Sequence, residues 1–354
     1  NYACDWDNVG LQVGNYGAPI NKILLCLDVS REIIEEAISL GADLIISHHP
    51  LLFSPLTSII KEGGKGEIIY RAIKNNINIY SAHTNMDIAP GGLNDYLLDK
   101  LDFKNSMVLE IIGKEQLYKL VVFVPKKYEV RVAEALNQGG AGHIGNYSHC
   151  SFRVDGIGTF KPMKGTNPFI GELGKVEKVE ETRLETIVAN TDLDRVIASM
   201  LEAHPYEEVA YDVIPLKNSG QERGIGRVAI LEDGKDLNEL VAMVKTKLGI
   251  KHLSVVGDLN KPISRVALVN GSGANYIELA KQRKCDCLIT GDVKYHDAQT
   301  ALELGIAVID AGHFETEIFF VDLIFNYLTA ALEDKGLDIE IVKSKVETSP
   351  LQII

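Results

Sequence analysis

The sequence contains little cysteine, no excess of positive charge and no long apolar run, and each of these absences excludes a class of protein. Its five cysteines are scattered through 354 residues. An odd count in a long chain excludes a disulfide framework and indicates a reducing compartment such as the cytoplasm. The net charge of −13 argues against nucleic acid as a partner, because affinity for phosphate comes mainly from clustered lysine and arginine. No segment has the length of apolar sequence that a membrane-spanning helix needs, so we expect no membrane partner.

The first third of the chain alternates short apolar strands with helices, which predicts a parallel sheet covered by helices on both faces. Ser30 is the expected N-cap of the first helix. The strands are predicted over 21–29, 42–50 and 77–87, and the helices over 30–41, 66–76 and 91–101.

The last third repeats this order. Here strands that each run into a turn are predicted over 264–273, 285–296 and 306–317, and the helices over 274–284, 297–305 and 318–328. Aligning the two halves matches LIISHH with LITGDVKYH, and NIYSAHTNMD with AVIDAGHFETE. In each half polar residues follow the same two strands, and ligand residues in open α/β sheets lie at the carboxyl ends of strands. We therefore predict an α/β fold with two quasi-repeated lobes, residues 1–113 and 221–354, that face one another and share a cleft.

The middle of the chain, residues 114–220, has a different pattern. Residues 118–142 predict a strand, a helix and a glycine-rich turn, residues 150–162 a strand pair, and residues 176–216 a strand, a helix and a strand. This β-α-β-β-α-β order is typical of a ferredoxin-like α+β domain. We interpret the segment as a domain inserted between the two lobes.

Histidine is concentrated at the predicted strand ends. Five of the nine histidines lie there, namely His48, His49, His83, His296 and His313. The other four, which we expect on the surface, are His143, His149, His204 and His252. Adjacent strand residues point to opposite faces, so His48 and His49 can serve one site only if the chain turns there, as Pro50 favours. His313 and Glu317 share a face if a helix begins near Gly312.

The combination of imidazole and carboxylate predicts a metal site. These groups suit zinc, iron or manganese and need no cysteine. The proposed ligands are His48, His49, Asp87, His313 and Glu317. Three histidines and two carboxylates exceed one open tetrahedral site and match two metals with a bridging carboxylate. Two metals about 3.5–4 Å apart can generate a hydroxide near neutral pH and stabilise an oxyanion.

Each of these residues also has a structural explanation when taken alone. A histidine after a strand is usually a structural hydrogen-bonding group, and Glu317 could be a favourable charge in the first turn of a helix. Their convergence on matched strand ends favours the metal site. We assign His83 and His296 as groups that contact the substrate or act as general acid or base, with a structural role as the alternative for each. Gly271 to Asn275 predicts a tight turn in preference to an anion site.

Five motifs together resemble the NIF-three-like family, whose members are also named GTP cyclohydrolase I type 2 homologues. They are WDNVGLQVG (6–14), SHHP (47–50), HTNMD (83–87), LITGDVKYH (288–296) and GHFETE (312–317). The resemblance covers both outer segments and implies that the same five ligands bind two metal ions, with Glu317 as the bridge. It also implies a ring-shaped homohexamer. The family's helix before WDNVG is absent from this sequence, so we expect natural residues to precede Asn1.

The inserted segment is also informative by resemblance. Longer bacterial members of the family carry an insertion similar to PII signalling proteins and divalent-cation-tolerance proteins, and HPYEEVAYDVIPL (204–216) is similar to the latter. We therefore expect a PII-like domain whose copies cluster as trimers in the hexamer.

Two functions are compatible with these features. The first is a hydrolase that uses two divalent metal ions, zinc before iron or manganese, on a small-molecule substrate for which a nucleotide such as GTP is the candidate. The alternative is a metal- or ligand-sensing regulatory hexamer, a trimer of dimers without turnover, which the PII-like insertion motivates.

Overall fold

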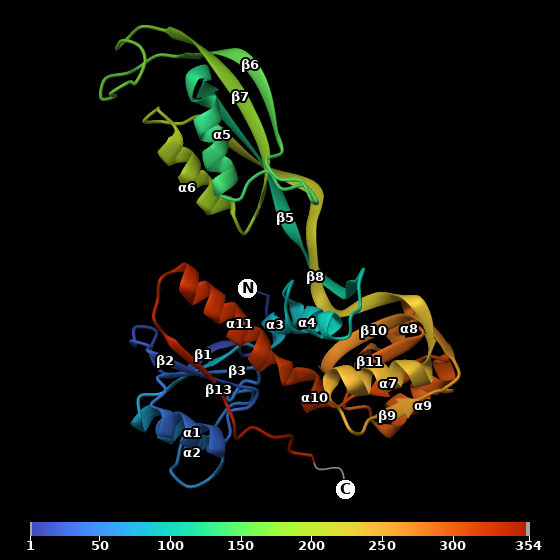
Figure 1. Ribbon diagram of the computed structural model, residues 1–354. Helices are drawn as coiled ribbons and strands as arrows, with labels where there is room; N and C mark the ends of the chain where they lie inside the picture. The colour runs from blue at the N-terminus through green and yellow to red at the C-terminus, as the bar shows by residue number, and fades with distance from the viewer. Residues whose placement is uncertain (1, 352–354) are drawn as a thin grey trace. The chain divides into compact units, whose positions relative to one another are not determined.

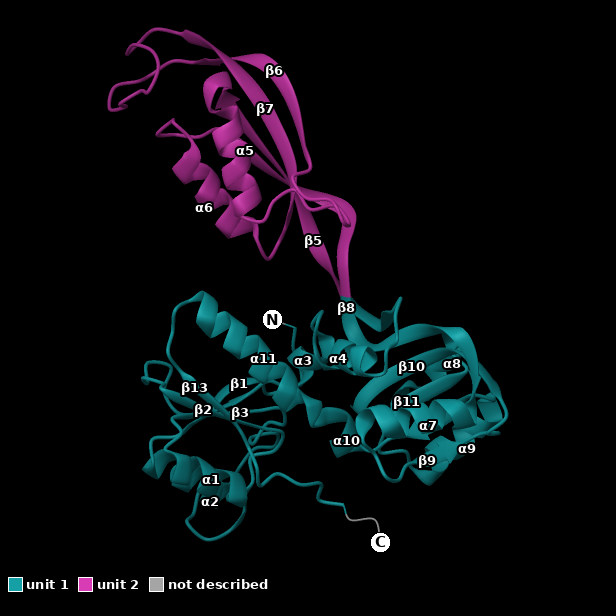
Figure 2. Ribbon diagram, in the orientation of Figure 1, with its two compact units in different colours: residues 1–112, 223–354 teal, residues 113–222 magenta. Residues whose placement is uncertain are grey.

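The computed structural model describes residues 2–351, which form two units. The first unit combines residues 1–112 with 223–354, and the second comprises residues 113–222 (Figure 2). Both outer segments, which the sequence presents as two lobes, therefore pack together within a single unit. The fold is a mixed α/β fold built on two sheets.

The N-terminal lobe is built on a five-stranded sheet in the order β1-β4-β3-β2-β13 (Figure 1). β13, β2, β3 and β4 are parallel, and β1 pairs antiparallel with β4 at the edge. The elements of this lobe are β1 (Gly10–Val13), β2 (Lys22–Cys26), α1 (Arg31–Leu40), β3 (Leu44–Ser47), α2 (Gly64–Lys74), β4 (Asn78–Ser81), α3 (Thr84–Ile88) and α4 (Leu93–Lys100), with β13 (Glu340–Lys343) added from the C-terminal end.

The central strand β2 shows why this sheet is covered on both faces. Leu24 and Cys26 pack into the core beneath α1, whereas Ile23 and Leu25 pack into a second core on the opposite face. Alternation of side chains along a strand sends successive residues to opposite faces, so a continuous apolar run needs a helix layer on each side. Ser30 caps α1 as predicted, because its Oγ accepts a hydrogen bond from the Ile33 N–H.

The C-terminal lobe has the same connectivity. Its strands run β8-β10-β11-β12-β9, with β10, β11 and β12 parallel and β9 antiparallel at the edge beside β12. The order β9-β10-α8-β11-α9-β12 repeats β1-β2-α1-β3-α2-β4, and β3 and β4 correspond to β11 and β12 as the matched sequence segments predict. The elements are α7 (Leu237–Leu248), β9 (Ser254–Val256), β10 (Pro262–Ser272), η2 (Ala274–Tyr276), α8 (Ile277–Gln282), β11 (Cys287–Gly291), α9 (Tyr295–Leu304), β12 (Ala307–Asp310), α10 (His313–Glu317) and α11 (Phe319–Asp334).

The last helix of each lobe packs on the sheet of the other lobe. α11 follows β12, but its Phe320, Val321 and Ile324 pack against Ile23 and Leu25 of β2. Figure 1 shows the red helix α11 lying along the blue strands. In the same way α4 follows β4 and inserts Leu97, Leu98 and Leu101 into the core of the C-terminal sheet. Full burial of each such side chain stabilises the fold by about 1.5–3 kcal/mol, so this exchange of helices holds the two lobes together.

Polar contacts fix the position of α4. Arg227 of β8 is 4% exposed. It donates from Nε to Asp95 Oδ1 at 2.5 Å and from a terminal nitrogen to Asp95 Oδ2 at 2.7 Å. Asn94, which is fully buried, accepts from the Asn270 N–H and donates to the Asp87 carbonyl. The amide of Asn94 therefore connects residues of both lobes next to their strand ends.

The Arg227–Asp95 pair gives a test of this arrangement. Asp95→Ala should lower the free energy of unfolding by about 3 kcal/mol, because it leaves a buried guanidinium without its counter-charge. Asp99→Ala, on an exposed residue of the same helix, should change it by less than about 0.5 kcal/mol. Urea denaturation of both variants measures the difference, and equal stabilities would contradict the structural role of the pair.

The middle unit has the predicted β-α-β-β-α-β order. Its strands lie in the spatial order β6-β7-β5-β8, and the core lies between this sheet and helices α5 and α6 (Figure 2). This order is that of a ferredoxin-like fold. The prediction of a strand pair over 150–162 is wrong, because these residues contain one strand, β6, which pairs with β7. The elements are β5 (Met107–Pro125), η1 (Lys126–Tyr128), α5 (Glu129–Gln138), β6 (Ser151–Phe160), β7 (Glu177–Ala189), α6 (Leu193–Ala203) and β8 (Tyr211–Asp236).

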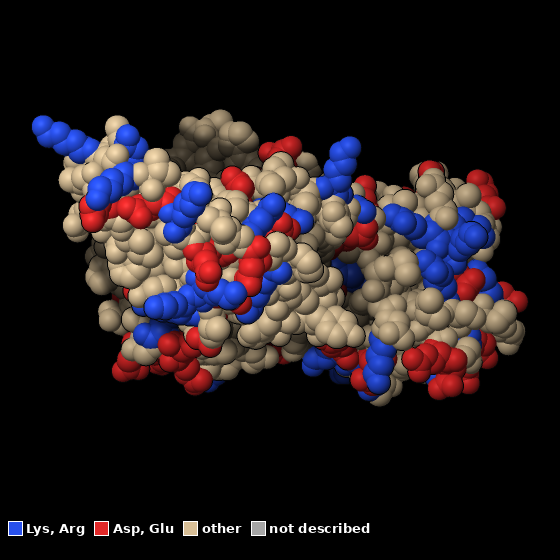
Figure 3. Space-filling model, turned by 90° about the horizontal axis from the view of Figure 1, so that it is seen from above, with Lys and Arg blue, Asp and Glu red and all other residues tan. Residues whose placement is uncertain are grey.

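Two features of the structure concern nucleic-acid binding and membrane insertion, against which the sequence argues. Lys and Arg side chains are interspersed with Asp and Glu on the face seen in Figure 3. Within residues 2–351, no helix is both long enough and apolar enough to cross a bilayer. Cys285 and Cys287 are buried core residues.

Candidate metal centre

Strand ends from both lobes bring the five predicted ligands together. His48 and His49 follow β3 directly, and Asp87 lies in the short helix α3 after β4. His313 and Glu317 are the first and last residues of α10, which begins after Gly312 as proposed. Gly312 has a φ of 93°, a conformation that glycine adopts without steric cost, and this allows the abrupt start of the helix.

The carboxylate of Glu317 is at the centre of the cluster. Its Oε2 lies 2.9 Å from His49 Nε2 and 2.9 Å from His313 Nε2, and these two nitrogens are 3.4 Å apart. Its Oε1 lies 3.6 Å from His48 Nε2, which in turn is 3.8 Å from Asp87 Oδ1. The side chain of Glu317 is only 5% exposed. The two carboxylate oxygens therefore face two different sets of side chains.

Hydrogen bonds on the far side of each imidazole determine which nitrogen faces Glu317. His49 Nδ1 lies 2.9 Å from Asp28 Oδ1, His313 Nδ1 lies 2.7 Å from Asp292 Oδ2, and His48 Nδ1 lies 2.9 Å from the Ala82 carbonyl. Because carboxylate and carbonyl oxygens only accept, Nδ1 carries the proton in each ring. The Nε2 lone pairs of the neutral rings then point toward the carboxylates.

Acceptors therefore face acceptors in the interior of the protein. With the rings in these neutral tautomers, His48 Nε2 and Glu317 Oε2 are buried without a hydrogen-bond donor. Buried polar atoms in this state cost free energy unless a donor or a cation lies between them. Ligand-competent atoms of His49, His313 and Glu317 all lie within 4.8 Å of one another, so this group could hold a metal ion.

The pKa shifts within the cluster indicate that it favours positive charge. Burial alone would raise the pKa of Glu317, but His48, His313 and His49 outweigh it and hold that pKa well below its usual value. Burial would lower the pKa of His49, yet Asp28 and Glu317 raise it to about 10. The hydrogen bond to Glu317 raises the pKa of His313 to about 9. Burial, together with the charge of Glu317, raises the pKa of Asp87.

Residues of β10 hold the two carboxylates in place. Asn270 Nδ2 donates to Asp87 Oδ1 at 2.8 Å and to Glu317 Oε1 at 3.1 Å. Gly271 follows with a φ of 59°, and a Cβ there would lie 2.0 Å from Glu317 Oε1. Any other residue at this position would displace the carboxylate.

The sequence prediction missed several of these supporting groups. Asp28 and Asp292 each come just after a strand, β2 and β11, so the strand-end rule that selected the histidines could have found them. Asn270 lies within the predicted strand, and no local pattern distinguishes it from a core position. Of the segment predicted as a tight turn, residues 271–272 end β10, Gly273 is the connection, and residues 274–275 begin η2.

His83 lies beside the cluster in an aromatic setting. Its ring centroid is 5.2 Å from that of His48 and 6.3 Å from those of Trp6 and Phe53. Its Nδ1 is 2.9 Å from Asp7 Oδ1, and Thr84 donates to the other oxygen of Asp7 from its backbone and hydroxyl. Burial would raise the pKa of Asp7, but the bonds from Thr84 and His83 lower it. Ligand-competent atoms of His83, His48 and His49 also lie within 4.8 Å of one another.

Two other histidines lie apart from this cluster. His296 is exposed on the first turn of α9, and its Nδ1 contacts Gln299 Oε1 at 3.0 Å. Its predicted contact with substrate stays a prediction. His204 was expected on the surface, and this is wrong: it is 7% exposed, because its ring is enclosed in the middle unit and hydrogen-bonded to backbone groups there.

A cavity gives access to one side of the cluster. It has a volume of about 1050 Å³, and its walls include His49, His313, Asp28 and Asp292. His49 and His313 are 24% and 34% exposed, whereas His48 is fully buried. A small molecule in this cavity would therefore meet the His49–His313 side of Glu317 first.

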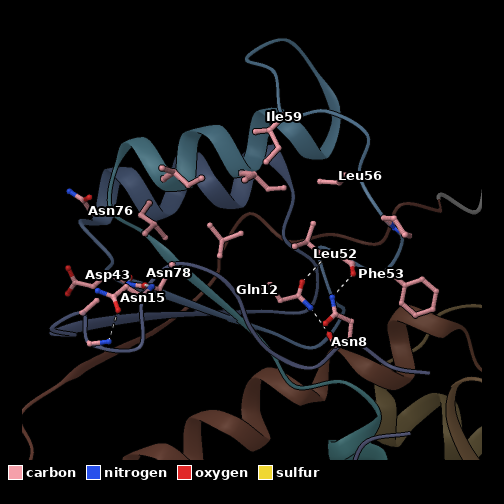
Figure 4. Close-up of a pocket in the computed structure, with 18 of the residues that line it drawn as sticks. Asn8, Gln12, Asn15, Asp43, Leu52, Phe53, Leu56, Ile59, Asn76 and Asn78 are labelled. Atoms are coloured by element: carbon pink, nitrogen blue, oxygen red, sulfur yellow. Dashed lines mark hydrogen bonds between the residues drawn. The ribbon is translucent and has the colours of Figure 1, made fainter. Parts of the chain in front are cut away.

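A second cavity, of about 1200 Å³, lies in the N-terminal lobe between β1, α2 and residues 52–59. Figure 4 shows Asn8 and Gln12 turned toward Leu52, whose backbone they engage through hydrogen bonds of 2.7 and 2.8 Å. Asp43 is the one ionisable residue among the described residues that line it. Its carboxylate accepts from the backbone of Asn21 and Lys22, so this cavity offers little chemistry.

Comparisons with known proteins agree with this architecture. A family model described as Duf34/NIF3 (NGG1p interacting factor 3) matches residues 1–350. The chain belongs to this family. It is 45% identical over 352 residues to a Halalkalibacterium halodurans protein named "GTP cyclohydrolase 1 type 2 homolog", covering 99% of this chain and 94% of that one. A Bacillus subtilis protein of the same name is 41% identical, covering 100% of this chain and 94% of the relative.

A solved structure supports the family assignment. A Bacillus cereus protein related to NIF3 is 42% identical and superimposes with a TM-score of 0.92, covering 100% of this chain and 94% of that chain. The resemblance seen in the five sequence motifs is thereby confirmed. Family membership establishes the fold, whereas the chemistry of the site has to be argued from its residues.

The close approach of Gly271 to Glu317 leads to a prediction. Gly271→Ala should displace Glu317 and reduce the amount of zinc that the protein retains after dialysis by at least about tenfold, because the carboxylate is common to both sets of ligands. Gly336→Ala is the matched control, since Gly336 has a similar φ of 63° but open space around it. Elemental analysis measures the difference. Equal zinc content in the two variants would show that Gly271 is needed only for its positive φ and not for the space that it leaves to Glu317.

Proposed function

We propose that this protein binds two divalent metal ions at His48, His49, Asp87, His313 and Glu317, and hydrolyses a small-molecule substrate there. The observation that carries the proposal is the position of Glu317. Its Oε2 faces His49 and His313, and its Oε1 faces His48, whose Nε2 also lies near Asp87. A carboxylate that presents its two oxygens to two separate ligand sets has the arrangement of a bridge between two ions.

The donor set fits the proposed metals. Neutral imidazole and carboxylate suit zinc first and also iron or manganese. The partnerless His48 Nε2 and Glu317 Oε2 would each gain a bond to a cation, which removes the cost of their burial. Asp28, Asp292 and the Ala82 carbonyl keep the rings in the tautomer that a metal requires. Two such ions would act as Lewis acids that activate water and offset negative charge on the substrate.

His83 is suited to move a proton beside this centre. Asp7 accepts from its Nδ1, which leaves Nε2 as the free position, and Thr84 holds Asp7 in turn. A carboxylate that orients an imidazole in this way is common to many general bases. We propose that His83 acts as a general acid or base, although its nitrogen also lies close enough to His48 and His49 to bind a metal.

The candidate substrate is a nucleotide. The relatives from Halalkalibacterium halodurans and Bacillus subtilis are named as homologues of GTP cyclohydrolase 1 type 2, which makes GTP the first compound to examine. The cavity beside His49 and His313 has a volume of about 1050 Å³. This exceeds the space that most small-molecule ligands require, so a nucleotide would fit.

Metal stoichiometry tests the two-ion site. Wild-type protein prepared without chelator should hold two divalent ions per chain, and Glu317→Gln should lose both, because the amide keeps the shape but removes the shared charge. His48→Ala and His313→Ala should each lose one ion, since each removes a ligand from only one side of Glu317.

His83→Ala should retain both ions if His83 moves protons and lose one if it is a ligand.

Elemental analysis and metal titration provide the measurement. His143→Ala, an exposed histidine of the middle unit, is the control and should match wild type. Loss of a single ion in Glu317→Gln would contradict the bridging role. No bound metal in wild-type protein after incubation with zinc, iron or manganese would contradict the proposal as a whole.

Turnover is tested separately. Metal-loaded protein should convert GTP, or another nucleotide of a panel, to a product seen by chromatography, and the rate should fall by at least about a hundredfold in His83→Gln, whose loss of acid–base chemistry is typically of this size. Absence of any product from wild-type protein with full metal content would overturn the hydrolase proposal while leaving the metal site intact.

A second candidate function is metal or ligand sensing by a homohexamer. The separate middle unit, with its ferredoxin-like order of strands, favours it, and we propose that this unit is the PII-like domain of the family. Sensing requires that ligand binding in the first unit alters the middle unit. Hydrogen exchange over residues 113–222 with and without metal and GTP discriminates between the two functions, because unchanged exchange excludes sensing.

A further inference from the structure

A pocket in the middle unit lies outside all the chemistry described so far. It has a volume of about 300 Å³ and is formed by the end of β6 and residues 161–170, by Glu181 of β7, and by residues 206–210 before β8. All of these residues belong to the same unit. The volume is at the lower end of the range for small-molecule sites, so the pocket suits a small ligand.

Three aromatic rings form a corner of this pocket. The ring centroids of Phe160 and Tyr206 are 5.8 Å apart with an interplanar angle of 62°, and those of Phe169 and Tyr206 are 6.3 Å apart at 53°. Phe169 is 51% exposed although it is a large apolar residue. All three rings line the pocket, and an aromatic face attracts cations through its quadrupole.

The charges that line the pocket have the complementary sign. Glu181, Glu207 and Glu208 contribute carboxylates, and Lys161 contributes the one ammonium group among the described lining residues. Tyr206 donates from its hydroxyl to Glu181 Oε1 at 3.0 Å. The site therefore combines aromatic faces with an excess of negative charge, which repels phosphates and other anions.

The pocket is also held in shape. His204 is 7% exposed; it lies 3.1 Å from the Phe123 carbonyl through Nε2, and its Nδ1 accepts from the Tyr206 N–H at 3.1 Å. Burial lowers the pKa of His204, so the ring stays neutral and fixes the backbone of Tyr206. Glu181 lies across Gly158, where a Cβ would be 1.9 Å from its Oε2. Fixed walls reduce the entropy lost on binding.

We propose that this pocket binds a small organic cation, with a primary or methylated ammonium group against the faces of Phe160, Phe169 and Tyr206 and with Glu181 as its counter-charge. The inference is independent of the metal centre and of the proposed hydrolysis. A metal ion is a poorer occupant, because no group of three ligand atoms close enough to hold one includes these carboxylates among the described residues.

The charge of the ligand can be tested with two probes of equal shape. Choline carries a trimethylammonium group, and 3,3-dimethyl-1-butanol has the same outline without the charge. Ligand-observed NMR titration of the full chain should show saturable binding of choline and at least about tenfold weaker binding of the alcohol, as expected for cation–π attraction and a nearby carboxylate. Equal affinities would show an apolar cavity only and would overturn the proposal.

Paired variants locate the binding. Tyr206→Leu and Glu181→Gln should each weaken choline binding about tenfold, because they remove an aromatic face and the counter-charge. Tyr147→Leu and Glu180→Gln replace exposed residues of the same types outside the pocket and should bind choline as wild type does. Tyr206→Phe keeps the ring and should retain most of the affinity, which separates loss of the aromatic face from loss of folding.

Each remaining outcome is decisive. Choline binding that survives both Tyr206→Leu and Glu181→Gln lies elsewhere and contradicts the assignment. Failure of choline, ethylammonium and spermidine to bind wild-type protein at millimolar concentration also overturns it. Zinc content should be the same in all five variants, so this result does not depend on whether the metal site or the hydrolase proposal is correct.

Discussion

The buried carboxylate of Glu317 imposes the main constraint on the first unit. Its Oε2 faces the Nε2 atoms of His49 and His313, whose lone pairs Asp28 and Asp292 hold inward. Its Oε1 lies near His48 Nε2 and accepts a hydrogen bond from Asn270. Such an arrangement is stable only if positive charge occupies the space between the acceptors. The raised pKa values of His49 and His313 and the depressed pKa of Glu317 express the same requirement in terms of protons. A divalent cation meets the same requirement and supplies more positive charge in a smaller volume than protons do.

The exchange of helices between lobes makes this constraint possible. Because α4 packs on the C-terminal sheet and α11 on the N-terminal sheet, the carboxyl ends of both sets of parallel strands are held next to each other. The apolar contacts provide most of the stabilisation, and the polar link from Asn94 to Asn270 and Asp87 sets the register. Asn270 then contacts both carboxylates of the cluster. The site thus belongs to neither lobe alone, and the internal repeat of the chain supplies its two halves.

The middle unit has a core of its own and a pocket that is separate from that core. Its apolar core lies between one sheet and two helices, and Phe160 at the end of β6 and Phe169 after it remain partly exposed instead of joining that core. An exposed aromatic corner next to three carboxylates is not needed for folding. The ferredoxin-like order and the pocket are separate features of this unit, because the order follows from the strands and the pocket from residues 161–170 and 206–210.

The sequence by itself determined the repeated α/β pattern, the family and the five side chains of the cluster. Apolar periodicity and strand-end polarity are local properties, so β2, β3, β4, β10, β11 and β12 could be predicted from them. Strands β1, β9 and β13 were not predicted, since they are edge strands whose pairing partners lie far along the chain or in the opposite direction. The single strand β6 was mistaken for a pair because its glycines suggest a turn.

Only the tertiary structure decided which residues support the cluster and how the lobes meet. Asn270, Asn94 and Gly271 have no distinctive local pattern, and their roles depend on contacts with residues more than 40 positions away. His204, just after α6, is likewise paired with a distant group, the Phe123 carbonyl of β5. Local sequence encodes the propensity of each segment, whereas a hydrogen bond or a close approach between distant segments exists only once the chain has folded.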